Sequence, residues 1–468
     1  MKKVKLSKAL KLASGAVVAV AAGFAVVALL IQYRIRVAND WQRYAKLPTL
    51  TKPNGNDSLV VFAPHCDDET LGCGGLLAMA NAKGAKVRVV LITNGDGYRI
   101  GVARAYGTIR VTPEMCIKYA YRRQKETLLA LGKLGISKRQ VTFLGYPDRG
   151  ISALWTEHWS SETLYVSNAT KTDRSPYANS FTLRAPYCGE SLLRDILSIL
   201  IAEKPTIVCA PHPFDDHPDH YAAYCFVAAA ITQLGLENPK LAARMRLLTY
   251  LVHRGDWPVP RGEHVNEPLA PPYALSGGET EWFTLPLSSE AVQAKKSAIR
   301  CYKSQTALEK GFLTSFARRN EIFGVLQKRT MPNVQTGTIT VDGSPADWKG
   351  IRPELIDPTG DHLLREISKG GDVRAVYTCT DGRFLYLRID CARPLSKRII
   401  YTTNIRVVSE ENNSAPPSGN QMRSSNISSV DRSGDSYTVV IKPGSFSEPE
   451  SAISSVRKNV LEIALPHV

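Results

Sequence analysis

The sequence lacks several patterns that would point directly to a function. None of its nine cysteines forms a Cys-x-x-Cys pair, and an odd number does not suit a fully paired exported chain, so we predict no disulfide. No internal repeat is present, and the net charge of +16 is not gathered into a dense run of basic and aromatic residues. We therefore predict no binding to nucleic acid. The composition, 44% hydrophobic and 22% charged, is typical of a folded protein.

Acidic residues are absent from residues 1–36, which carry five lysines and two arginines. Within this segment, residues 12–31 have no charge, and their length matches a bilayer-spanning helix. We predict an uncleaved membrane anchor whose lysine-rich flank stays cytoplasmic, so that the rest of the chain is extracytoplasmic, in a bacterium in the periplasm or on the outer face. The alternative is a secreted protein, cleaved near Ala19–Ala21.

The length of 468 residues exceeds what one hydrophobic core usually supports, so we expect two or more domains. We divide the chain into a tail and anchor, a polar tether, a catalytic domain and a C-terminal domain, with the boundaries 1–37, 38–57, 58–326 and 337–468. The last of these has sixteen basic and sixteen acidic residues. The excess positive charge therefore lies in the anchor segment and in the middle of the chain, where it could favour an anionic substrate.

The fold of the middle domain follows from short apolar runs that alternate with helical patterns. The runs SLVVFA, KVRVVLIT, QVTFLG and TIVCA each precede a helix-like segment or a polar loop, which predicts a Rossmann-like, mainly parallel sheet with helices on both faces. Residues 95–108 are expected to be a glycine-bearing loop. Residues 152–185 are expected to be a loop-rich insertion that either shapes a cleft or is simply solvated.

The C-terminal domain contains short, alternating runs that predict an all-β sandwich. Leu385, Leu387 and Ile389 fall on one face of such a strand. A turn at Asp381–Gly382 would place Cys379 near Phe384 across a hairpin, so that Cys379 and Cys391 do not face each other.

Chemically reactive side chains gather where the first apolar run ends, in the segment PHCDDE. His65 and Asp68 lie three residues apart, close enough to reach one ion from a tight turn. An imidazole with a carboxylate is a zinc-type ligand pair, and a catalytic zinc usually has three protein ligands and one open position. A third ligand must therefore come from elsewhere in the chain.

A second cluster, APHPFDDHPDHYAAY at residues 210–224, has the same setting between a strand and a helix. Because the carboxyl ends of parallel strands meet at one edge of a sheet, the two clusters are expected to converge. In the alternative interpretation, Asp216 and Asp219 only cap the helix and the histidines are solvated.

The two clusters together resemble the PIG-L/LmbE family of zinc-dependent N-acetylglucosaminyl deacetylases, with its AHPDDE and HPDH motifs. The likeness extends over residues 58–325 through DDETLGCGG, RQKETLLALGKLG, FLGYPDRG and KKSAIRCYKSQ. The sequence departs from the family at Cys66, where proline is usual. A thiolate ligand at Cys66 stays open but is not favoured, because neighbouring side chains diverge.

The resemblance implies roles for eight residues. His65, Asp68 and His220 would bind one Zn²⁺, although another divalent transition metal would also fit. Asp67 would be the general base that takes a proton from the attacking water. His217, protonated, would donate to the oxyanion or the leaving amine, with Asp219 raising the pKa of its ring and orienting it. Arg123 and Asp148 would hold sugar hydroxyls, unless Arg123 only pairs with Glu126 or Asp148 on a helix face.

The C-terminal domain is similar to family 9 carbohydrate-binding modules and DOMON-like relatives, on the basis of Asp347-Trp348 and the hairpin that follows. We expect Trp348 to be a core residue rather than a sugar-stacking one. The sequence as a whole predicts an anchored zinc deacetylase that acts on an N-acetylglucosamine-type sugar in a polysaccharide, glycan or glycolipid. The alternatives are an amidase acting on another N-acyl sugar or a sugar-thiol conjugate, and a non-catalytic glycan-binding protein.

Overall fold

The structure is a computed structural model. It describes residues 45–255, 257–276, 280–306, 311–326, 330–356 and 371–395, together with residues 37, 40 and 41 and the strands at 401–406, 427–433, 436–441, 453–457 and 460–466. Among these residues, no helix combines the length and the apolar character needed to cross a membrane. The anchor predicted at residues 12–31 lies outside the described residues.

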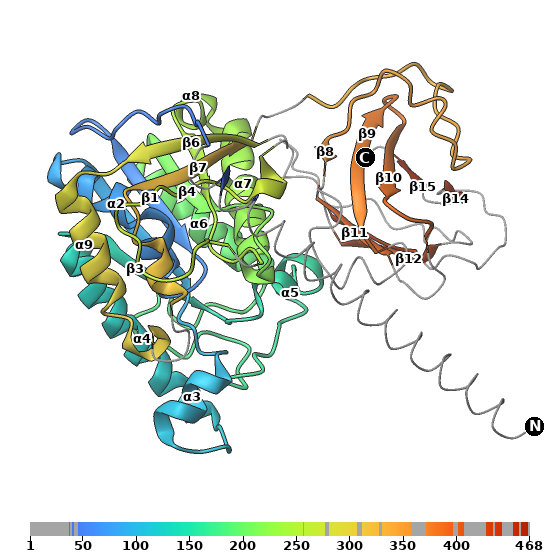
Figure 1. Cartoon of the computed structure of the whole chain (residues 1–468). Helices are drawn as coiled ribbons and strands as arrows, with labels where there is room; N and C mark the ends of the chain where they lie inside the picture. The colour runs from blue at the N-terminus through green and yellow to red at the C-terminus, as the bar shows by residue number, and fades with distance from the viewer. Residues whose placement is uncertain are drawn as a thin grey trace, which may run out of the picture.

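A mainly parallel sheet forms the centre of the first domain (Figure 1), and within the described residues it has seven strands in the order β3-β2-β1-β4-β5-β7-β6. The parallel strands are β1 (Ser58–Ala63), β2 (Lys86–Thr93), β3 (Val141–Tyr146), β4 (Ile207–Pro211) and β5 (Arg246–Tyr250). The strands β7 (Asn320–Leu326) and β6 (Thr280–Pro286) complete the sheet in antiparallel orientation. The predicted mainly parallel sheet is confirmed.

Both faces of the sheet are buried, which explains why the strand sequences are almost continuously apolar. Along β1, Leu59 and Val61 join one hydrophobic core, while Val60 and Phe62 join the other. Three helices cover the first core: α2 (Asp68–Ala82), α4 (Pro113–Lys133) and α9 (Ser289–Ile299). Three others cover the second core: α5 (Ile151–Thr156), α6 (Gly189–Glu203) and α7 (Pro218–Glu237). Further short helices are α8 (Pro239–Ala242), α10 (Lys303–Thr306), η1 (Lys138–Gln140), η2 (Tyr273–Leu275) and η3 (Leu313–Phe316).

The order of the strands creates a switch point beside β1. The chain runs outward from β1 through β2 to β3, and then returns to place β4 on the other side of β1. The loops that follow β1 and β4 therefore lie next to each other at the carboxyl edge of the sheet. This is the place where open α/β sheets bind their ligands.

Residues 95–108 are not the loop that we predicted, because they contain the helix α3 (Arg99–Tyr106). Tertiary packing explains the helix. Val102 is buried in a small core with Cys116 and Tyr119 of α4, and Gly107 ends the helix in a left-handed conformation (φ 62°). A local pattern dominated by glycine does not reveal this packing.

Part of the predicted tether packs against the domain. The N–H of Leu50 donates to the carbonyl of Thr284 at 2.8 Å, and the N–H of Thr284 donates to the carbonyl of Pro48 at 2.9 Å. Leu50 is also buried in the first core. The residues just before β1 therefore extend the sheet edge at β6.

The C-terminal part of the chain is antiparallel throughout its described strands. One sheet has the order β14-β15-β10-β9-β8 and the other β11-β13-β12. The strands are β8 (Leu355–Ile356), β9 (Val373–Thr380), β10 (Phe384–Cys391), β11 (Tyr401–Arg406), β12 (Ile427–Ser433), β13 (Ser436–Ile441), β14 (Ile453–Arg457) and β15 (Val460–Pro466). Among the described residues of this part the all-β character is confirmed, and the stacking of the two sheets into a sandwich stays a prediction.

Two details of this region bear on the sequence predictions. Trp348 is buried in a core with Tyr386, as expected of a core residue, and is not presented for stacking on a sugar. The predicted hairpin register is wrong: Cys379 lies opposite Tyr386 rather than near Phe384. The reason is that the connection between β9 and β10 has three residues, 381–383, with Gly382 at φ 80°.

Candidate active site

The loop after β1 positions the first cluster by means of an unusual backbone conformation. Asp67 precedes α2 with a φ of 137°, a value that residues other than glycine rarely adopt. The sharp turn directs the side chains of successive residues to different places. Cys66 is buried in the first hydrophobic core and does not belong to the groups of described side chains whose donor atoms lie close enough together to hold a metal ion.

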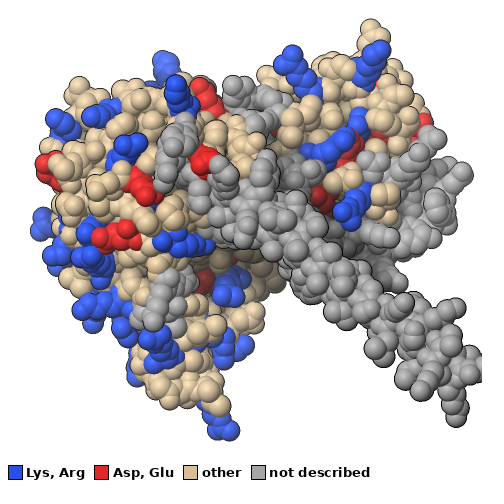
Figure 2. All heavy atoms as spheres, viewed as in Figure 1, with Lys and Arg blue, Asp and Glu red and all other residues tan. Residues whose placement is uncertain are grey.

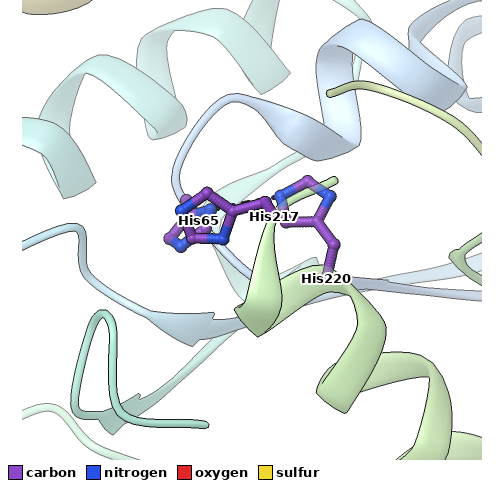
Figure 3. A group of neighbouring side chains, drawn as sticks. All are labelled: His65, His217 and His220. Carbon is purple, nitrogen blue, oxygen red and sulfur yellow. Dashed lines mark hydrogen bonds between the residues drawn. The ribbon is translucent and has the colours of Figure 1, made fainter. Parts of the chain in front are cut away.

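Three atoms from the two loops lie at similar distances from one another. His65 Nδ1 is 3.1 Å from Asp68 Oδ2, Asp68 Oδ2 is 3.0 Å from His220 Nε2, and His220 Nε2 is 3.3 Å from His65 Nδ1. Two ligand atoms of a tetrahedral zinc ion, each about 2.0–2.1 Å from the metal, are about 3.3–3.4 Å apart. The three residues proposed from the sequence thus have the donor spacing that a metal ion requires. Figure 3 shows the rings of His65 and His220, with His217 beside them.

The surroundings of these atoms also suit a cation. All three residues are buried, and the second carboxylate oxygen of Asp68, Oδ1, has no hydrogen-bond partner. Burial raises the pKa of Asp68, but the neighbouring rings of His220 and His65 outweigh it and hold this pKa well below its usual range. The site therefore contains an ionised carboxylate with unused bonding capacity.

Two further carboxylates orient the histidine rings, as carboxylates commonly do behind metal ligands. Asp215 Oδ2 is 3.1 Å from His220 Nδ1 and also accepts the backbone N–H groups of Val252 and His253. Asp219 Oδ2 is 3.3 Å from His65 Nε2. Asp215 was missed from the sequence, because the spacing of the aspartates in this loop does not distinguish the one that reaches His220.

The predicted partnership between Asp219 and His217 is wrong. The carboxylate of Asp219 accepts the backbone N–H groups of Arg149 (2.6 Å) and Ile151 (3.1 Å) in addition to its contact with His65. Asp219 contacts His217 only through its backbone N–H, which donates to His217 Nδ1 at 3.2 Å. Asp219 thus orients His65 and the loop after β3.

The predicted protonation of His217 is also not supported. Burial, together with the rings of His65, His220 and His253, lowers the pKa of His217 to about 2. The ring is therefore neutral. Because a backbone N–H donates to Nδ1, the hydrogen of the neutral ring is on Nε2, which makes Nε2 a hydrogen-bond donor.

Asp67 lies beside the three donor residues and faces a cation. Its Oδ2 is 3.3 Å from Arg123 Nη2. Burial raises the pKa of Asp67 well above its usual range, and the nearby Asp68 and Glu69 raise it further, while Arg123 opposes them. A carboxylate with a raised pKa is a stronger base, as general-base catalysis requires.

A cavity of about 240 Å³ opens beside these residues. Its lining includes His65, Asp67, Leu71, Tyr98, Arg123, Asp148, Arg149, His217, His253, Gln305, Phe312 and Leu313. Both predicted substrate-binding residues, Arg123 and Asp148, therefore line the same cavity as the predicted base. The cavity draws on loops from the carboxyl ends of several parallel strands, as the switch-point topology predicts.

Arg123 and Asp148 are held in fixed positions in this lining. Arg123 Nη2 donates to the carbonyl of Cys66 at 2.6 Å, and its buried Nε has no hydrogen-bond partner. Asp148 Oδ2 accepts the N–H of Gly97 at 2.8 Å, and Oδ1 is 3.3 Å from His65 Nε2. Glu126, the alternative partner of Arg123, instead accepts hydrogen bonds from Ser304.

His253 is a site residue that sequence reasoning missed. It follows β5 and lines the cavity, with Nε2 3.9 Å from Asp68 Oδ1 and its ring stacked on Phe312. The available signal was its place three residues beyond a parallel strand, at the same edge as the two recognised clusters. By contrast, His212 is a core residue: it donates or accepts a hydrogen bond with Thr280, and burial lowers its pKa to about 3.

Three glycines and the buried ion pair between Lys295 and Glu321 hold α2, the helix that carries Asp68, close to its neighbours. A methyl group at Gly72 would overlap the ring of Tyr250, and one at Gly75 would overlap Leu287. One at Gly74 would lie 3.1 Å from the stem of Lys295. The motif LGCGG is therefore explained by close packing around α2.

Comparison with known proteins finds similarity over part of the chain. Residues 60–231 match the PIG-L family, described as GlcNAc-PI de-N-acetylase. A curated relative, the 1D-myo-inositol 2-acetamido-2-deoxy-alpha-D-glucopyranoside deacetylase of Corynebacterium kroppenstedtii, is 29% identical over 173 residues. This alignment covers 36% of the chain and 39% of the relative, so the chain spans about two fifths of the length of that relative.

Two solved structures are also similar. A conserved protein from Thermus thermophilus is 24% identical, with a TM-score of 0.35 and coverage of 58% of this chain and 96% of that one. The N,N'-diacetylchitobiose deacetylase from Pyrococcus horikoshii is 17% identical, with a TM-score of 0.35 and coverage of 62% and 91%.

Proposed function

We propose that this protein, which carries a PIG-L family domain at residues 60–231, is a zinc-dependent deacetylase that hydrolyses the N-acetyl group of an N-acetylglucosamine-type sugar. The products would be acetate and the free amine. The observation that carries the proposal is the group formed by His65 Nδ1, Asp68 Oδ2 and His220 Nε2, whose atoms lie 3.0–3.3 Å apart at the edge of a cavity. The curated relative is a deacetylase of an acetamido sugar by its name, which supports the same substrate class.

A zinc ion held by these three atoms would supply Lewis acidity, polarising the acetamide carbonyl and lowering the pKa of a water. Asp67, next to the donor atoms and facing Arg123, would accept the proton of the attacking water. The same proton would then be available to the leaving nitrogen. His217 would act as a neutral donor, with Nε2–H directed to the oxyanion, which differs from the protonated role implied by the family resemblance.

The size and polarity of the cavity suit one sugar residue. A volume of about 240 Å³ is below the ~300–1,000 Å³ of pockets that enclose drug-sized ligands. The negatively charged carboxylate of Asp148 can accept a hydrogen bond from a sugar hydroxyl group, and the positively charged guanidinium of Arg123 can donate one. In a larger glycan or glycolipid, the remainder of the substrate would lie outside this cavity.

The test is release of free amine from N-acetylglucosamine, its oligosaccharides and lipid-linked forms by the full-length protein. Activity should disappear with a chelator and return with zinc. Asp67→Asn should retain zinc and lose hydrolysis, because only the base is removed. An active, zinc-loaded Asp67→Asn protein would refute the assignment of the base.

The same panel distinguishes the alternatives. Faster cleavage of larger N-acyl groups or of sugar-thiol conjugates would identify an amidase of different specificity. Sugar binding without any amine release, with zinc bound, would identify a non-catalytic glycan-binding protein.

For the location of the protein we propose a single anchor at residues 12–31 with the catalytic domain outside the cytoplasm. This rests on the uncharged length of the segment and on its lysine-rich flank. Fractionation of cells should recover the protein in membranes, resistant to carbonate and released by detergent. Recovery of a soluble chain that begins after residue 21 would instead support signal cleavage.

A further inference from the structure

Helix α3 and the turn after it project from the domain at the carboxyl edge of the sheet (Figure 1). We call residues 99–110 the α3 tip. Of the twelve exposed large apolar side chains among the described residues, three lie in this tip: Ile100 (67% exposed), Tyr106 (41%) and Ile109 (97%). Single exposed apolar residues are common on protein surfaces, but three within ten residues form a concentrated group.

The exposure of these apolar side chains does not result from poor packing of the helix. The inner side of α3 is well buried, with Val102 fully enclosed against Cys116 and Tyr119. Burial of a side chain such as Ile109 would be favourable relative to its exposure to water. The tip therefore presents apolar surface outward from a well-packed base, as a site that is covered by a partner does.

The charge of the tip indicates the kind of partner. Arg99, Arg104 and Arg110 are exposed, and residues 99–110 contain no acidic residue. On the adjacent α4, Lys118 and Arg122 are exposed as well, against one exposed acid, Glu114. Figure 2 shows basic side chains around the projection that Figure 1 labels α3. A partner must therefore combine negative charge with an apolar interior.

We propose that the α3 tip docks on an anionic lipid bilayer. Apolar side chains inserted at the headgroup boundary, with arginines paired to lipid phosphates around them, are the arrangement by which peripheral proteins bind such surfaces. A soluble polyanion such as a nucleic acid or an acidic polysaccharide satisfies the arginines but not Ile100 and Ile109.

The position of the tip gives the docking a consequence. Tyr98, the residue immediately before α3, lines the cavity of the candidate active site. Insertion of the tip would hold the mouth of this cavity at the level of the lipid headgroups. The docking itself does not depend on the proposed deacetylase activity and is tested without a substrate.

The experiment uses the full-length protein with phosphatidylglycerol vesicles whose acyl chains carry bromine, which quenches tryptophan at short range. Because residues 12–31 could bring the whole chain to any bilayer, the readout must be local to the tip. We compare Ile109→Trp with Ile201→Trp, a matched control near the end of α6, which lies at the opposite edge of the sheet. The added emission of each variant is measured relative to the wild type.

The added emission of Ile109→Trp should be lost with brominated phosphatidylglycerol and retained with unbrominated vesicles, while that of Ile201→Trp should be retained with both. Reversing the three arginines of the tip to glutamate in the Ile109→Trp background should abolish the quenching. Unquenched Ile109→Trp, or equal quenching of both variants, would overturn the proposal. Ile100→Trp provides a second probe of the same kind. A change in the emission of Ile109→Trp on addition of polyphosphate, without quenching by the brominated vesicles, would identify a soluble polyanion as the partner and contradict the bilayer.

Discussion

Replacing Lys295 with methionine is expected to lower the free energy of unfolding of the α/β domain by about 3–5 kcal/mol, as for other buried charge pairs that lose one partner. Lys295 of α9 and Glu321 of β7 form an ion pair with Nζ 2.6 Å from Oε1. Both side chains are about 1% exposed, so water does not screen the pair. Methionine keeps most of the volume of the lysine stem and removes its charge.

The magnitude follows from the groups that the substitution leaves behind. Lys295 Nζ also donates to the carbonyl of Leu71 at 2.7 Å, while Glu321 accepts the N–H groups of Gly75 (2.6 Å) and Leu76 (2.8 Å). Without the ammonium, a buried carboxylate has no counter-charge and a buried carbonyl loses a donor. Since these backbone groups belong to α2, which begins at Asp68, the variant is also expected to bind zinc more weakly.

The assay is urea unfolding of the full-length protein, followed by tryptophan fluorescence and by circular dichroism. The neighbouring Lys296→Met variant is a matched control, because Lys296 pairs with Glu263 at the same 2.6 Å but at the surface, with 22% and 31% exposure. Surface pairs contribute about 0–1 kcal/mol. Combining Lys295→Met with Glu321→Gln should recover part of the loss, because the unpaired charge is gone. If the free energies of unfolding of Lys295→Met and Lys296→Met differed by less than about 1 kcal/mol, the reasoning would be refuted.

Three further predictions concern the site and its supports. In thermal unfolding, Gly72→Ala should destabilise the protein by about 1–3 kcal/mol, because the added methyl group overlaps the ring of Tyr250. The control Gly132→Ala, whose methyl group would meet no neighbouring atom, should be neutral or stabilising. His217→Ala should retain zinc, measured by elemental analysis, and should no longer release the amine, whereas His220→Ala should lose the metal. A His217→Ala protein without metal would show that His217 is a ligand, which its proximity to His65 and His220 permits. Burial raises the pKa of Asp96 to about 7, so its contribution to stability is fully present below about pH 4 and declines as the pH rises toward 7. The stability difference between the wild type and Asp96→Asn should therefore shrink by about 1 kcal/mol or more from about pH 5 to about pH 8, and a difference that is independent of pH would contradict the raised pKa.

The residues of the candidate metal centre could be identified from the sequence because their signal is local. His65 and Asp68 directly follow one apolar run, and His220 lies in the first turn of a helix after another. A polar cluster at the carboxyl end of a buried strand is conspicuous, and parallel strands bring such clusters to one edge. The mainly parallel sheet follows from the same alternation of apolar runs and helices.

The partners of these residues could be decided only by the tertiary structure. Asp215 and Asp219 look equivalent along the chain, yet one reaches His220 and the other His65, because they leave the loop in different directions. The contacts of His253 with Asp68 and of Lys295 with Glu321 cannot be read from neighbouring residues, because they depend on segments that pack together from far along the chain.

The sequence by itself determined which strands end in chemically reactive side chains, since apolar periodicity and the position of polar clusters are properties of neighbouring residues. The tertiary structure decided which carboxylate orients which ring, that the surroundings of His217 lower its pKa, and that residues 99–106 form a helix with an exposed apolar tip. The physical reason is that hydrogen bonds, pKa values and burial are set by distances between residues remote in the chain, which the folded packing alone establishes.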